Sequence, residues 1–368
     1  MLCKHYGKCG GCQLQHLSYK KQLSYKVNRV TNLFKIEPEE IMPSPKIFYY
    51  RNRMDWVVGP NYEVGLKERG KWWAYVDIND CLLQSKESNI IRNSFREFIK
   101  EKKVLPWNTI EHTGLVRYIV IREGKFTDER MVTIVTYKTN EFEKYRNLWI
   151  EFLEMIKDYV STVYWGVNPD LADVSYVKEK YLLWGNKYLR EKLINNIYYI
   201  LPNTFFQPNS YTAEILLKKA IELLEPKSKD TIFDLYSGIG TFSIEIAKYC
   251  NKVIGVDSDP ETKELFYLNA KYNEIKNIEF MSKRVEELQR IKADKILLDP
   301  PRSGIHPKAI RLIGDSNANA IVYVSCNPKT QYRDIRKLES YGYSLERYIL
   351  IDQFPHTLHI ESIALLKK

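Results

Sequence analysis

The sequence predicts two domains: a β-rich (α+β) domain in the N-terminal and central part, and an α/β domain with a doubly wound parallel sheet in the C-terminal part. Two observations predict this. Between residues 46 and 200, short runs rich in β-branched and aromatic residues indicate strands. From residue 201 onward, short apolar strands that end near glycine or aspartate alternate with helical stretches, which is typical of a doubly wound parallel sheet.

The composition predicts a cytoplasmic globular protein that binds a polyanion. The chain has 368 residues, 44% of them hydrophobic and 28% charged, which is enough for two or three domains with full-sized cores. It contains no apolar run of about 18 residues, and its start lacks the apolar segment of a secretory signal, so we expect no membrane partner. The formal net charge of +10 favours nucleic acid as the partner, with a lysine-rich proteome as the alternative explanation. No feature indicates a protein partner, so we expect a monomer.

Cysteines at the start of the chain predict a metal site. They form the pattern C-x5-C-G-G-C with Cys3, Cys9 and Cys12. In a cytoplasmic protein such a group indicates metal binding rather than disulfides. We expect Cys81 as the fourth ligand, because the other two cysteines belong to the C-terminal part; His5 and His16 are alternatives. Four thiolates suit either Zn²⁺ or an iron–sulfur cluster, and the spacing does not separate the two.

A basic amphipathic helix is predicted at residues 18–34. Ser18 is the expected N-cap, and apolar residues recur at spacings of three and four, at Leu23, Val27, Val30 and Phe34. Prolines 38, 43 and 45 end the helix and predict a linker.

The β-rich domain has predicted strands at Met54–Val58, Trp72–Ile78, Arg117–Arg122 and Met131–Thr136, and a helix near Glu141–Tyr159. Basic residues adjoin aromatic ones in Tyr49–Arg53 and in Lys71–Trp73. A sheet that presents these residues to RNA is one interpretation, and a solvated sheet edge is the other.

The α/β domain begins with a helix predicted at Thr212–Leu224. Strands are predicted at Thr231–Tyr236, Lys252–Asp257, Lys295–Asp299 and Ala320–Val324. After the first of these strands, a glycine loop leads into a helix that ends near Tyr249. The last of these strands runs into a turn that carries Cys326, which is either a reactive thiol or a small buried apolar residue.

The glycine loop indicates which kind of cofactor the domain binds. Gly238 and Gly240 follow the first strand, and Asp257 stands at the end of the next, about 20 residues on, where an acid can bind ribose hydroxyls. A dinucleotide site requires a third glycine to admit a pyrophosphate, but Ser243 occupies that position. With Asp234 ahead of it, the loop resembles the S-adenosylmethionine loop of class I methyltransferases.

Four further motifs make the resemblance specific. They are Phe-Phe-Gln-Pro-Asn (205–209), Asp-Pro-Pro-Arg-Ser-Gly (299–304), Ser-Cys-Asn-Pro (325–328) and His-Thr-Leu-His-Ile-Glu (356–361). Together with Tyr50-Arg51-Asn52 and the N-terminal cysteines, they are similar to the RNA uracil-C5 (m5U) methyltransferase family over nearly the whole chain. The resemblance implies a Rossmann-like class I methyltransferase domain at 201–368, an iron–sulfur and RNA-binding domain at 1–17 and 36–200, and a helix at 18–35 that packs on the catalytic domain.

The resemblance also implies ligands. It implies a [4Fe-4S] cluster in place of zinc, held by Cys3, Cys9, Cys12 and Cys81. It implies contacts to S-adenosylmethionine from Gln207, Tyr236, Gly238, Asp257 and Asp299.

Three departures from the family pattern stand out. Larger members begin with a small β-barrel RNA-binding domain, whereas this chain starts at the cluster cysteines, so we expect a compact form. Arg284 stands where many members have a short polar residue for the adenine, and that contact stays unassigned. Thr241 replaces a common Asn.

The chemistry of uracil methylation requires one nucleophile and one base at the same ring. Carbon 5 is a poor nucleophile until a thiolate adds to carbon 6, and a base must afterwards remove the carbon-5 proton. The resemblance assigns these roles to Cys326 and Glu361. Arg302 is the expected source of the positive charge that lowers the thiol pKa. A uracil inside folded RNA must also be flipped out of its stack.

Alternative functions remain open. An RNA cytosine-C5 methyltransferase usually carries a cysteine directly after the proline of its Asp-Pro motif, where this chain has Pro301 and Arg302. An amino-group methyltransferase would not require Cys326. A non-catalytic RNA-binding protein with a relic fold would not require the intact glycine loop. Transfer RNA and ribosomal RNA are both open as substrates, and the compact form favours the T-loop uridine of transfer RNA.

Overall fold

The computed structural model describes residues 2–35 and 37–368, which form two compact units. The N-terminal unit comprises Met1–His16, Lys46–Lys192 and Ile200–Asn203. The C-terminal unit comprises Leu17–Pro45, Leu193–Tyr199 and Thr204–Lys368. Within the described ranges, no helix is both long and apolar enough to cross a membrane.

The units differ from the expected boundaries at Leu17, at residues 201–203 and in two longer segments. Residues 37–45, expected to be a linker to the β-rich domain, belong to the C-terminal unit because β1 (Glu40–Met42) pairs with β16 (Ser344–Ile351). Residues 193–199 also belong there, because the side chains of Asn269 and Asn273 accept hydrogen bonds from the backbone amides of Tyr199 and Ile197, at 2.7 and 2.9 Å. The local sequence of these two segments does not indicate that they belong to the C-terminal unit.

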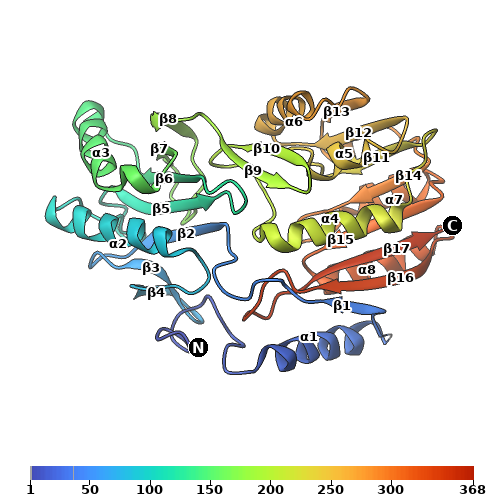
Figure 1. Ribbon diagram of the computed structural model, residues 1–368, viewed down its shortest axis with the longest axis horizontal. Coiled ribbons are helices and arrows are strands. Elements are labelled where there is room, and N and C mark those ends of the chain that lie inside the picture. Colours follow the sequence, from blue (N-terminus) through green and yellow to red (C-terminus); the bar gives the residue numbers. More distant parts are fainter. Residues whose placement is uncertain (1, 36) are drawn as a thin grey trace. The chain divides into compact units, whose positions relative to one another are not determined.

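The C-terminal unit contains an eight-stranded sheet in the order β1-β16-β17-β15-β14-β11-β12-β13 (Figure 1). Its other strands are β11 (Thr231–Leu235), β12 (Lys252–Asp257), β13 (Ile278–Ser282), β14 (Lys295–Leu298), β15 (Ala320–Ser325) and β17 (Glu361–Lys367). All pairs are parallel except those of β17, which runs antiparallel to both β15 and β16. The chain order reverses at β11, which lies between β12 and β14, and such a switch point opens a crevice at the carboxyl ends of the strands.

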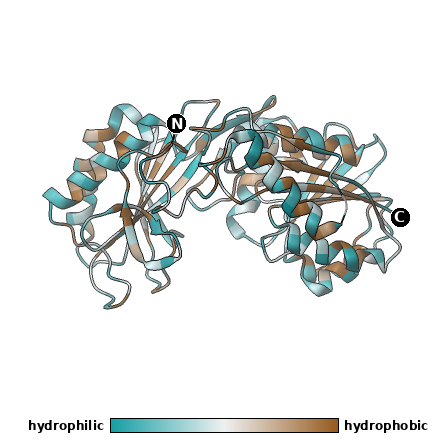
Figure 2. Ribbon diagram, turned by 90° about the horizontal axis from the view of Figure 1, so that it is seen from below, coloured by the Kyte–Doolittle hydropathy of each residue, from teal (hydrophilic) through white to brown (hydrophobic). Residues whose placement is uncertain are grey.

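Helices cover this sheet: α1 (Tyr19–Phe34), α4 (Ser210–Leu224), α5 (Thr241–Ile246), α6 (Pro260–Tyr272), α7 (Pro307–Gly314) and α8 (Pro328–Glu339), with a short 3₁₀ helix, η2 (Val285–Glu287). Three of them start with a proline at the first helical position after a capping residue, at Asp259, His306 and Asn327. These caps fix sharp strand-to-helix turns at the carboxyl edge. In Figure 2 the strands are mostly brown (hydrophobic), and teal (hydrophilic) residues are frequent along the helices.

Helix α1 covers the predicted segment, and its buried face includes the predicted Val30 and Phe34 but is rotated toward polar residues in its first half. Its buried residues are Gln22, Lys26, Val30 and Phe34, whereas Leu23 and Val27 are only half-buried. Ser18 occupies the N-cap position as predicted, although its side chain makes no capping hydrogen bond. The rotation follows from polar partners in the C-terminal unit: Lys26 pairs with Asp352 at 2.5 Å, and Gln22 lies 3.1 Å from His356.

The N-terminal unit contains a seven-stranded sheet in the order β4-β3-β2-β5-β6-β7-β8, in which only β6 and β7 are parallel. The strands are β2 (Arg53–Val58), β3 (Val64–Glu68), β4 (Lys71–Asp77), β5 (Val116–Glu123), β6 (Arg130–Thr136), β7 (Thr162–Val167) and β8 (Glu179–Gly185). Helices α2 (Lys86–Glu101) and α3 (Phe142–Ile156) and the 3₁₀ helix η1 (Lys157–Tyr159) accompany the sheet. Strands β9 (Leu189–Leu193) and β10 (Asn196–Ile200) form a separate two-stranded sheet. The four strands and the helix predicted here are confirmed, with ends shifted by one to three residues.

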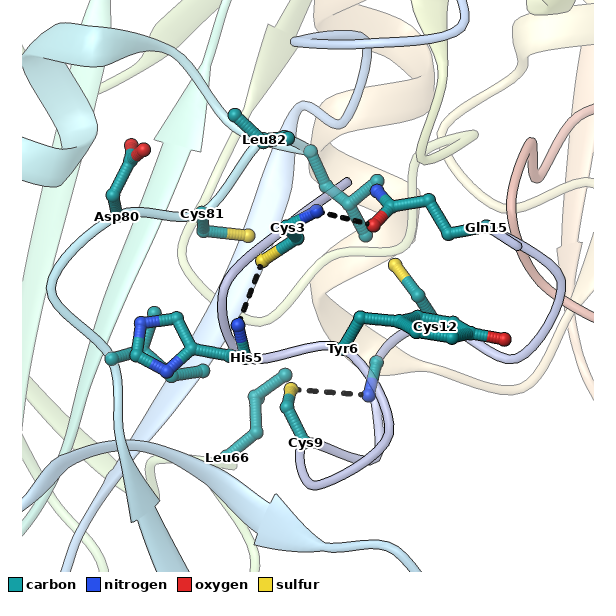
Figure 3. Close-up of a pocket in the computed structure, with 13 residues that line it drawn as sticks. Cys3, His5, Tyr6, Cys9, Cys12, Gln15, Leu66, Asp80, Cys81 and Leu82 are labelled. Carbon is teal, nitrogen blue, oxygen red and sulfur yellow. Dashed lines mark hydrogen bonds between the residues drawn. The ribbon is translucent and has the colours of Figure 1, made fainter. Parts of the chain in front are cut away.

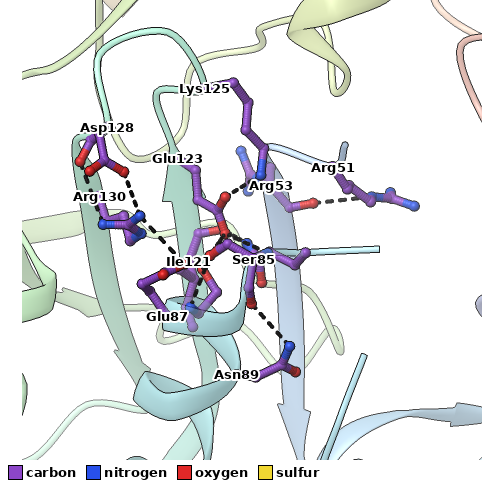
Figure 4. A network of polar contacts seen from close by, with 12 residues as sticks. Arg51, Arg53, Ser85, Glu87, Asn89, Ile121, Glu123, Lys125, Asp128 and Arg130 are labelled. Atoms are coloured by element: carbon purple, nitrogen blue, oxygen red, sulfur yellow. Dashed lines mark hydrogen bonds and ion pairs between the residues drawn. The ribbon is translucent and has the colours of Figure 1, made fainter. Parts of the chain in front are cut away.

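Helix α2, which the sequence analysis missed, is fixed by a polar network at its start (Figure 4). Ser85 is its N-cap and accepts a hydrogen bond from the amide of Ser88 at 3.1 Å. Both hydroxyls donate to the buried carboxylate of Glu123, at the end of β5, which also pairs with Lys125. The cap itself is local, since Ser88 is three residues after Ser85, and only Glu123 and Lys125 come from a distant segment.

Candidate active site

A cavity of about 670 Å³ lies in the C-terminal unit at the carboxyl edge of its parallel strands. All seven residues that the sequence analysis placed at the cofactor and the substrate line it: Gln207, Tyr236, Gly238, Asp257, Asp299, Cys326 and Glu361. Additional lining residues that were not predicted include Phe205, Asp259, Lys283, Gln353 and Phe354. A volume of this size is within the range of small-molecule sites.

Strand register brings Cys326 and Glu361 together. In the antiparallel pair of β15 and β17, Ser325 is opposite Ser362. The next position beyond this pair therefore brings Cys326, the residue after β15, opposite Glu361, the first residue of β17. The hydroxyl of Ser362 also donates to the carbonyl of Ser325 at 3.0 Å, which holds the two strand ends at this point.

A side chain next to Cys326 joins its turn to the Asp-Pro-Pro-Arg loop. Asn327 caps α8 with its side-chain oxygen, and its amide nitrogen donates to the carbonyl of Arg302 at 2.8 Å. The guanidinium of Arg302 is in turn 3.4 Å from the ring of His359. Three of the motifs used for the family resemblance thus meet through these contacts.

The thiol of Cys326 is protonated at neutral pH in this structure. Burial, and then the nearby carboxyls of Glu361 and Asp299, raise its pKa to about 12, while Arg302 acts in the opposite direction. The expectation that Arg302 activates the thiol is therefore only partly met, because desolvation outweighs one exposed cation. A further positive charge is required for the thiolate to form.

A chain of hydrogen bonds connects two carboxyl groups of the cavity. Gln207 donates to Asp299 at 2.9 Å, and Gln353 donates to the side-chain oxygen of Gln207 at 2.8 Å. The same nitrogen of Gln353 donates to Oε2 of Glu361 at 3.2 Å. Gln353 and Glu361 are 1% and 2% exposed, so water does not compete for these bonds. The donor direction leaves Oε1 of Glu361 as the oxygen that can exchange a proton with a substrate.

Both carboxyl groups hold protons more tightly than usual. Burial, and then the charge of Asp234, raise the pKa of Asp299 to about 7. Burial and then Asp299 raise the pKa of Glu361 well above its ordinary value, while the donor from Gln353 lowers it. A buried carboxyl with a raised pKa is suited to exchange protons near neutral pH.

The glycine loop and Asp257 form a polar cradle at the other side of the cavity lining. The amides of Gly238 and Asp259 donate to the two carboxylate oxygens of Asp257 at 2.9 and 3.0 Å. Gly238 has φ +51°, and a Cβ at this position would meet only open space. Ser243, at the position of the third glycine, donates to Asp234 at 2.5 Å. The cradle offers carboxylate acceptors and no pyrophosphate site, which fits a nucleoside with free ribose hydroxyls.

The four predicted metal ligands share one pocket in the N-terminal unit (Figure 3). The amide of His5 donates to the sulfur of Cys3 at 3.5 Å, and the amide of Gly11 to the sulfur of Cys9 at 3.3 Å. Burial raises the pKa of Cys9, Cys12 and Cys81. Four cysteines are a donor set that suits either Zn²⁺ or an iron–sulfur cluster. Within residues 2–35 and 37–368, however, no group of three or more His, Cys, Asp or Glu takes a metal-binding arrangement.

Comparisons with known proteins agree with this geometry. The family described as tRNA (Uracil-5-)-methyltransferase matches residues 127–368. A tRNA (uracil(54)-C(5))-methyltransferase of Pyrococcus horikoshii is 43% identical over 99% of this chain and 85% of its own. A 23S rRNA (uracil(747)-C(5))-methyltransferase of Pyrococcus furiosus is 37% identical over 100% and 85%. The crystal structure of a Pyrococcus abyssi tRNA (uracil-54, C5)-methyltransferase with S-adenosyl-L-homocysteine superposes with TM-score 0.82 and 38% identity, over 97% of this chain and 85% of that one.

Proposed function

The chain belongs to the tRNA (uracil-5-)-methyltransferase family and is an S-adenosylmethionine-dependent RNA uracil-C5 methyltransferase; from this premise we propose that it makes 5-methyluridine with Cys326 as nucleophile and Glu361 as base. The observation that carries the proposal is that both side chains line one cavity, just beyond Ser325 and Ser362, the last pair of β15 and β17. One activated thiol and one base at the same ring are what methylation of carbon 5 demands.

The proposed reaction has two protein steps. The Cys326 thiolate adds to carbon 6, and the electron pair moves to carbon 5 and the ring carbonyl, which makes carbon 5 nucleophilic. S-adenosylmethionine, when bound, supplies the electrophilic methyl group that carbon 5 takes up. Glu361 then removes the carbon-5 proton, the bond between sulfur and carbon 6 breaks, and the thiolate is released. The proton that the Cys326 thiol loses before the attack goes to solvent. After release of the product, the proton on Glu361 returns to the Cys326 thiolate, so that one proton is set free for each methyl group transferred and both side chains regain their starting states.

The raised pKa values of Cys326 and Glu361 support a mechanism in which activation of the thiol depends on the positive charge of the cofactor. The pKa of Cys326 is raised to about 12, and burial and then Asp299 raise the pKa of Glu361 well above its ordinary value. A positive sulfonium in the same cavity lowers both values by Coulomb attraction. Asp257 and Gly238 would hold the ribose side of that cofactor, with Tyr236, Gln207 and Asp299 as the further contacts. Activation of the thiol would then coincide with cofactor binding.

We infer that the substrate is transfer RNA, at the T-loop uridine 54. The relatives named as tRNA enzymes are 40–43% identical to this chain, whereas those named as 23S rRNA enzymes are 34–37% identical. A methylation assay distinguishes transfer RNA from 23S rRNA as the substrate. It compares a tRNA transcript, the U54C variant of that transcript and an rRNA fragment around uridine 747. Methylation of the rRNA fragment alone would refute the assignment.

We also infer that Cys3, Cys9, Cys12 and Cys81 hold a [4Fe-4S] cluster. Support comes from their shared pocket and from the two amide-to-sulfur hydrogen bonds, which stabilise thiolates. Metal binding replaces the thiol protons that burial retains. The cluster has no role in the methyl-transfer steps above.

Trapping of the covalent adduct tests the mechanism. Cys326→Ala should bind S-adenosylmethionine and RNA without forming an adduct, and should lose several powers of ten in turnover. Glu361→Gln should methylate and then accumulate a protein–RNA adduct that survives denaturing electrophoresis and carries the methyl group. Cys250→Ala, which changes a buried cysteine that does not line the cavity, is the matched control and should turn over normally. Substantial turnover by Cys326→Ala would refute the covalent route.

A further inference from the structure

Two tryptophans in the hairpin of β3 and β4 have no partner in the strand pairing. Lys67 and Glu68 are adjacent on β3, but their partners on β4 are Tyr75 and Lys71. The three residues between these partners, 72–74, therefore pair with no residue of β3. Two of the three are Trp72 and Trp73, which are 65% and 56% exposed. Their rings pack edge to face, with centroids 5.7 Å apart. We call residues 72–74 the tryptophan bulge.

This exposure contrasts with the other tryptophans. Trp56, Trp107, Trp149 and Trp165 are each at most 3% exposed, and Trp184 is half-buried. Exposing two indole rings forgoes the hydrophobic stabilisation that burial would provide. Bulges of this kind redirect side chains and are frequent beside functional sites. The tryptophan bulge therefore has the features of a binding surface.

Residues 8–10, which we call the cysteine segment, pair with the tip of this hairpin. Cys9 forms a β-bridge with Glu68, the amide of Gly10 donates to Lys67 at 3.1 Å, and the amide of Arg69 donates to Lys8 at 3.0 Å. A Cβ at Gly10 would lie 3.1 Å from that Lys67 carbonyl, so only glycine allows this approach without displacement. The segment thus flanks β3 on the side opposite β4, and the tip is ordered from both sides.

The surroundings of the tryptophan bulge are cationic. Lys8, Arg69 and Lys71 are exposed at or beside the hairpin tip. Lys71 pairs with Glu68 at 2.5 Å, whereas Lys8 and Arg69 form no ion pair within the described part of the chain. Aromatic rings next to uncompensated cations match unpaired nucleic acid, where bases stack and phosphates contact cations. Charged residues on an edge strand also disfavour pairing with another protein strand.

We propose that the tryptophan bulge is a stacking platform for unpaired bases of the RNA substrate, with Lys8 and Arg69 contacting the adjacent phosphates. The proposal rests on RNA being the substrate, as under the proposed function, and adds where on the N-terminal unit the RNA is held. It concerns binding, and assigns no catalytic role to either tryptophan.

Steady-state methylation of a full-length tRNA transcript tests the platform. Trp72→Ala/Trp73→Ala should raise KM for RNA about 10- to 100-fold, the range for one or two lost stacking contacts, and leave kcat and the KM for S-adenosylmethionine unchanged. Trp72→Phe/Trp73→Phe keeps aromatic faces and should restore most of the affinity. Ile110→Ala, which removes a side chain 73% exposed elsewhere in the same unit, should behave like the wild type.

Tryptophan fluorescence provides a readout that does not depend on catalysis. RNA should quench the exposed indole emission of the wild-type protein, and the alanine double variant should lose this quenching. Equal KM and equal quenching in the double variant would overturn the platform. Concentration-dependent self-association that the double variant abolishes, with RNA affinity unchanged, would assign the bulge to a second copy and overturn it equally. A wild type that binds RNA with quenching but makes no 5-methyluridine would refute the proposed function and leave the platform intact.

Discussion

Gln353 lowers the proton affinity of Glu361 through a direct hydrogen bond. It donates to the carboxylate and so favours its ionised form. Gln353→Met keeps the volume and removes the donor, so the pKa of Glu361, already raised by burial, should rise further. Because Glu361 must be ionised to take a proton, the acidic limb of the kcat–pH profile should move to higher pH, by up to about one unit for one lost hydrogen bond.

A second buried glutamine provides the matched control. Gln331 donates to the carbonyl of Tyr323 and accepts from Ser362, with no contact to either carboxyl group. Gln331→Met should lower the free energy of unfolding but leave the acidic limb in place. An acidic limb that stays unmoved in Gln353→Met would show that the hydrogen bond from Gln353 does not tune Glu361.

The roles of individual residues could be predicted from the sequence where the residue type itself is reactive. Cys326 and Glu361 stand in motifs at strand ends, and the sequence analysis placed both at the site. Gln353 was missed because its amide has no reactive signature, and one of its partners, Gln207, is 146 residues away. The raised pKa of Cys326 was also missed, since burial depends on packing that spacing does not reveal.

Helix α1 supports the loop that carries Gln353. Lys26, 1% exposed, pairs with Asp352 and donates to the carbonyl of Phe354 at 2.9 Å. Lys26→Met leaves Asp352 as a buried unpaired charge, which should lower the free energy of unfolding by about 3–5 kcal/mol. Lys26→Met/Asp352→Asn should recover part of that loss. Urea unfolding of the full chain measures both, and a double variant no more stable than the single would contradict a direct pairing.

In Cys81→Ser, loss of the proposed cluster should be accompanied by loosening of the hairpin of β3 and β4. Protein purified without oxygen should contain about four iron and four sulfide per chain, and Cys81→Ser should bleach it. Because residues 8–10 pair with 67–69, hydrogen exchange in β3 and β4 should rise in the same variant. Cys250→Ser, in the C-terminal unit, should keep its colour. Colourless protein with one zinc per chain would contradict the iron–sulfur assignment.

Elements with a strong local pattern could be predicted, and those defined by distant partners could not. The parallel strands β11, β12, β14 and β15 are rich in apolar, mostly β-branched residues, and they were all predicted. Strand β1 has three residues in a proline-rich segment and exists only because β16 offers an edge. The buried face of α1 was predicted only in its second half, because Gln22 and Lys26 are polar and only their partners make burial favourable.

For the molecule as a whole, charge should dominate the grip on RNA. A net charge of +10 implies that phosphate contacts and counterion release supply much of the affinity. Binding of a tRNA transcript should fall by orders of magnitude between about 50 and 200 mM salt. A nearly flat salt response would count against RNA as the substrate.

The salt dependence also separates stacking from charge within the same complex. Stacking releases no counterions, so Trp72→Ala/Trp73→Ala should weaken binding by the same factor at every salt concentration and leave the slope of log K against log salt unchanged. Arg69→Ala removes one phosphate contact and should reduce that slope by about one. Arg311→Ala, an exposed cation on α7 that is paired with Asp315, serves as the control and should leave the slope as it is. A slope that falls in the tryptophan variant would mean that the rings act by positioning cations, because only lost phosphate contacts change the number of ions released.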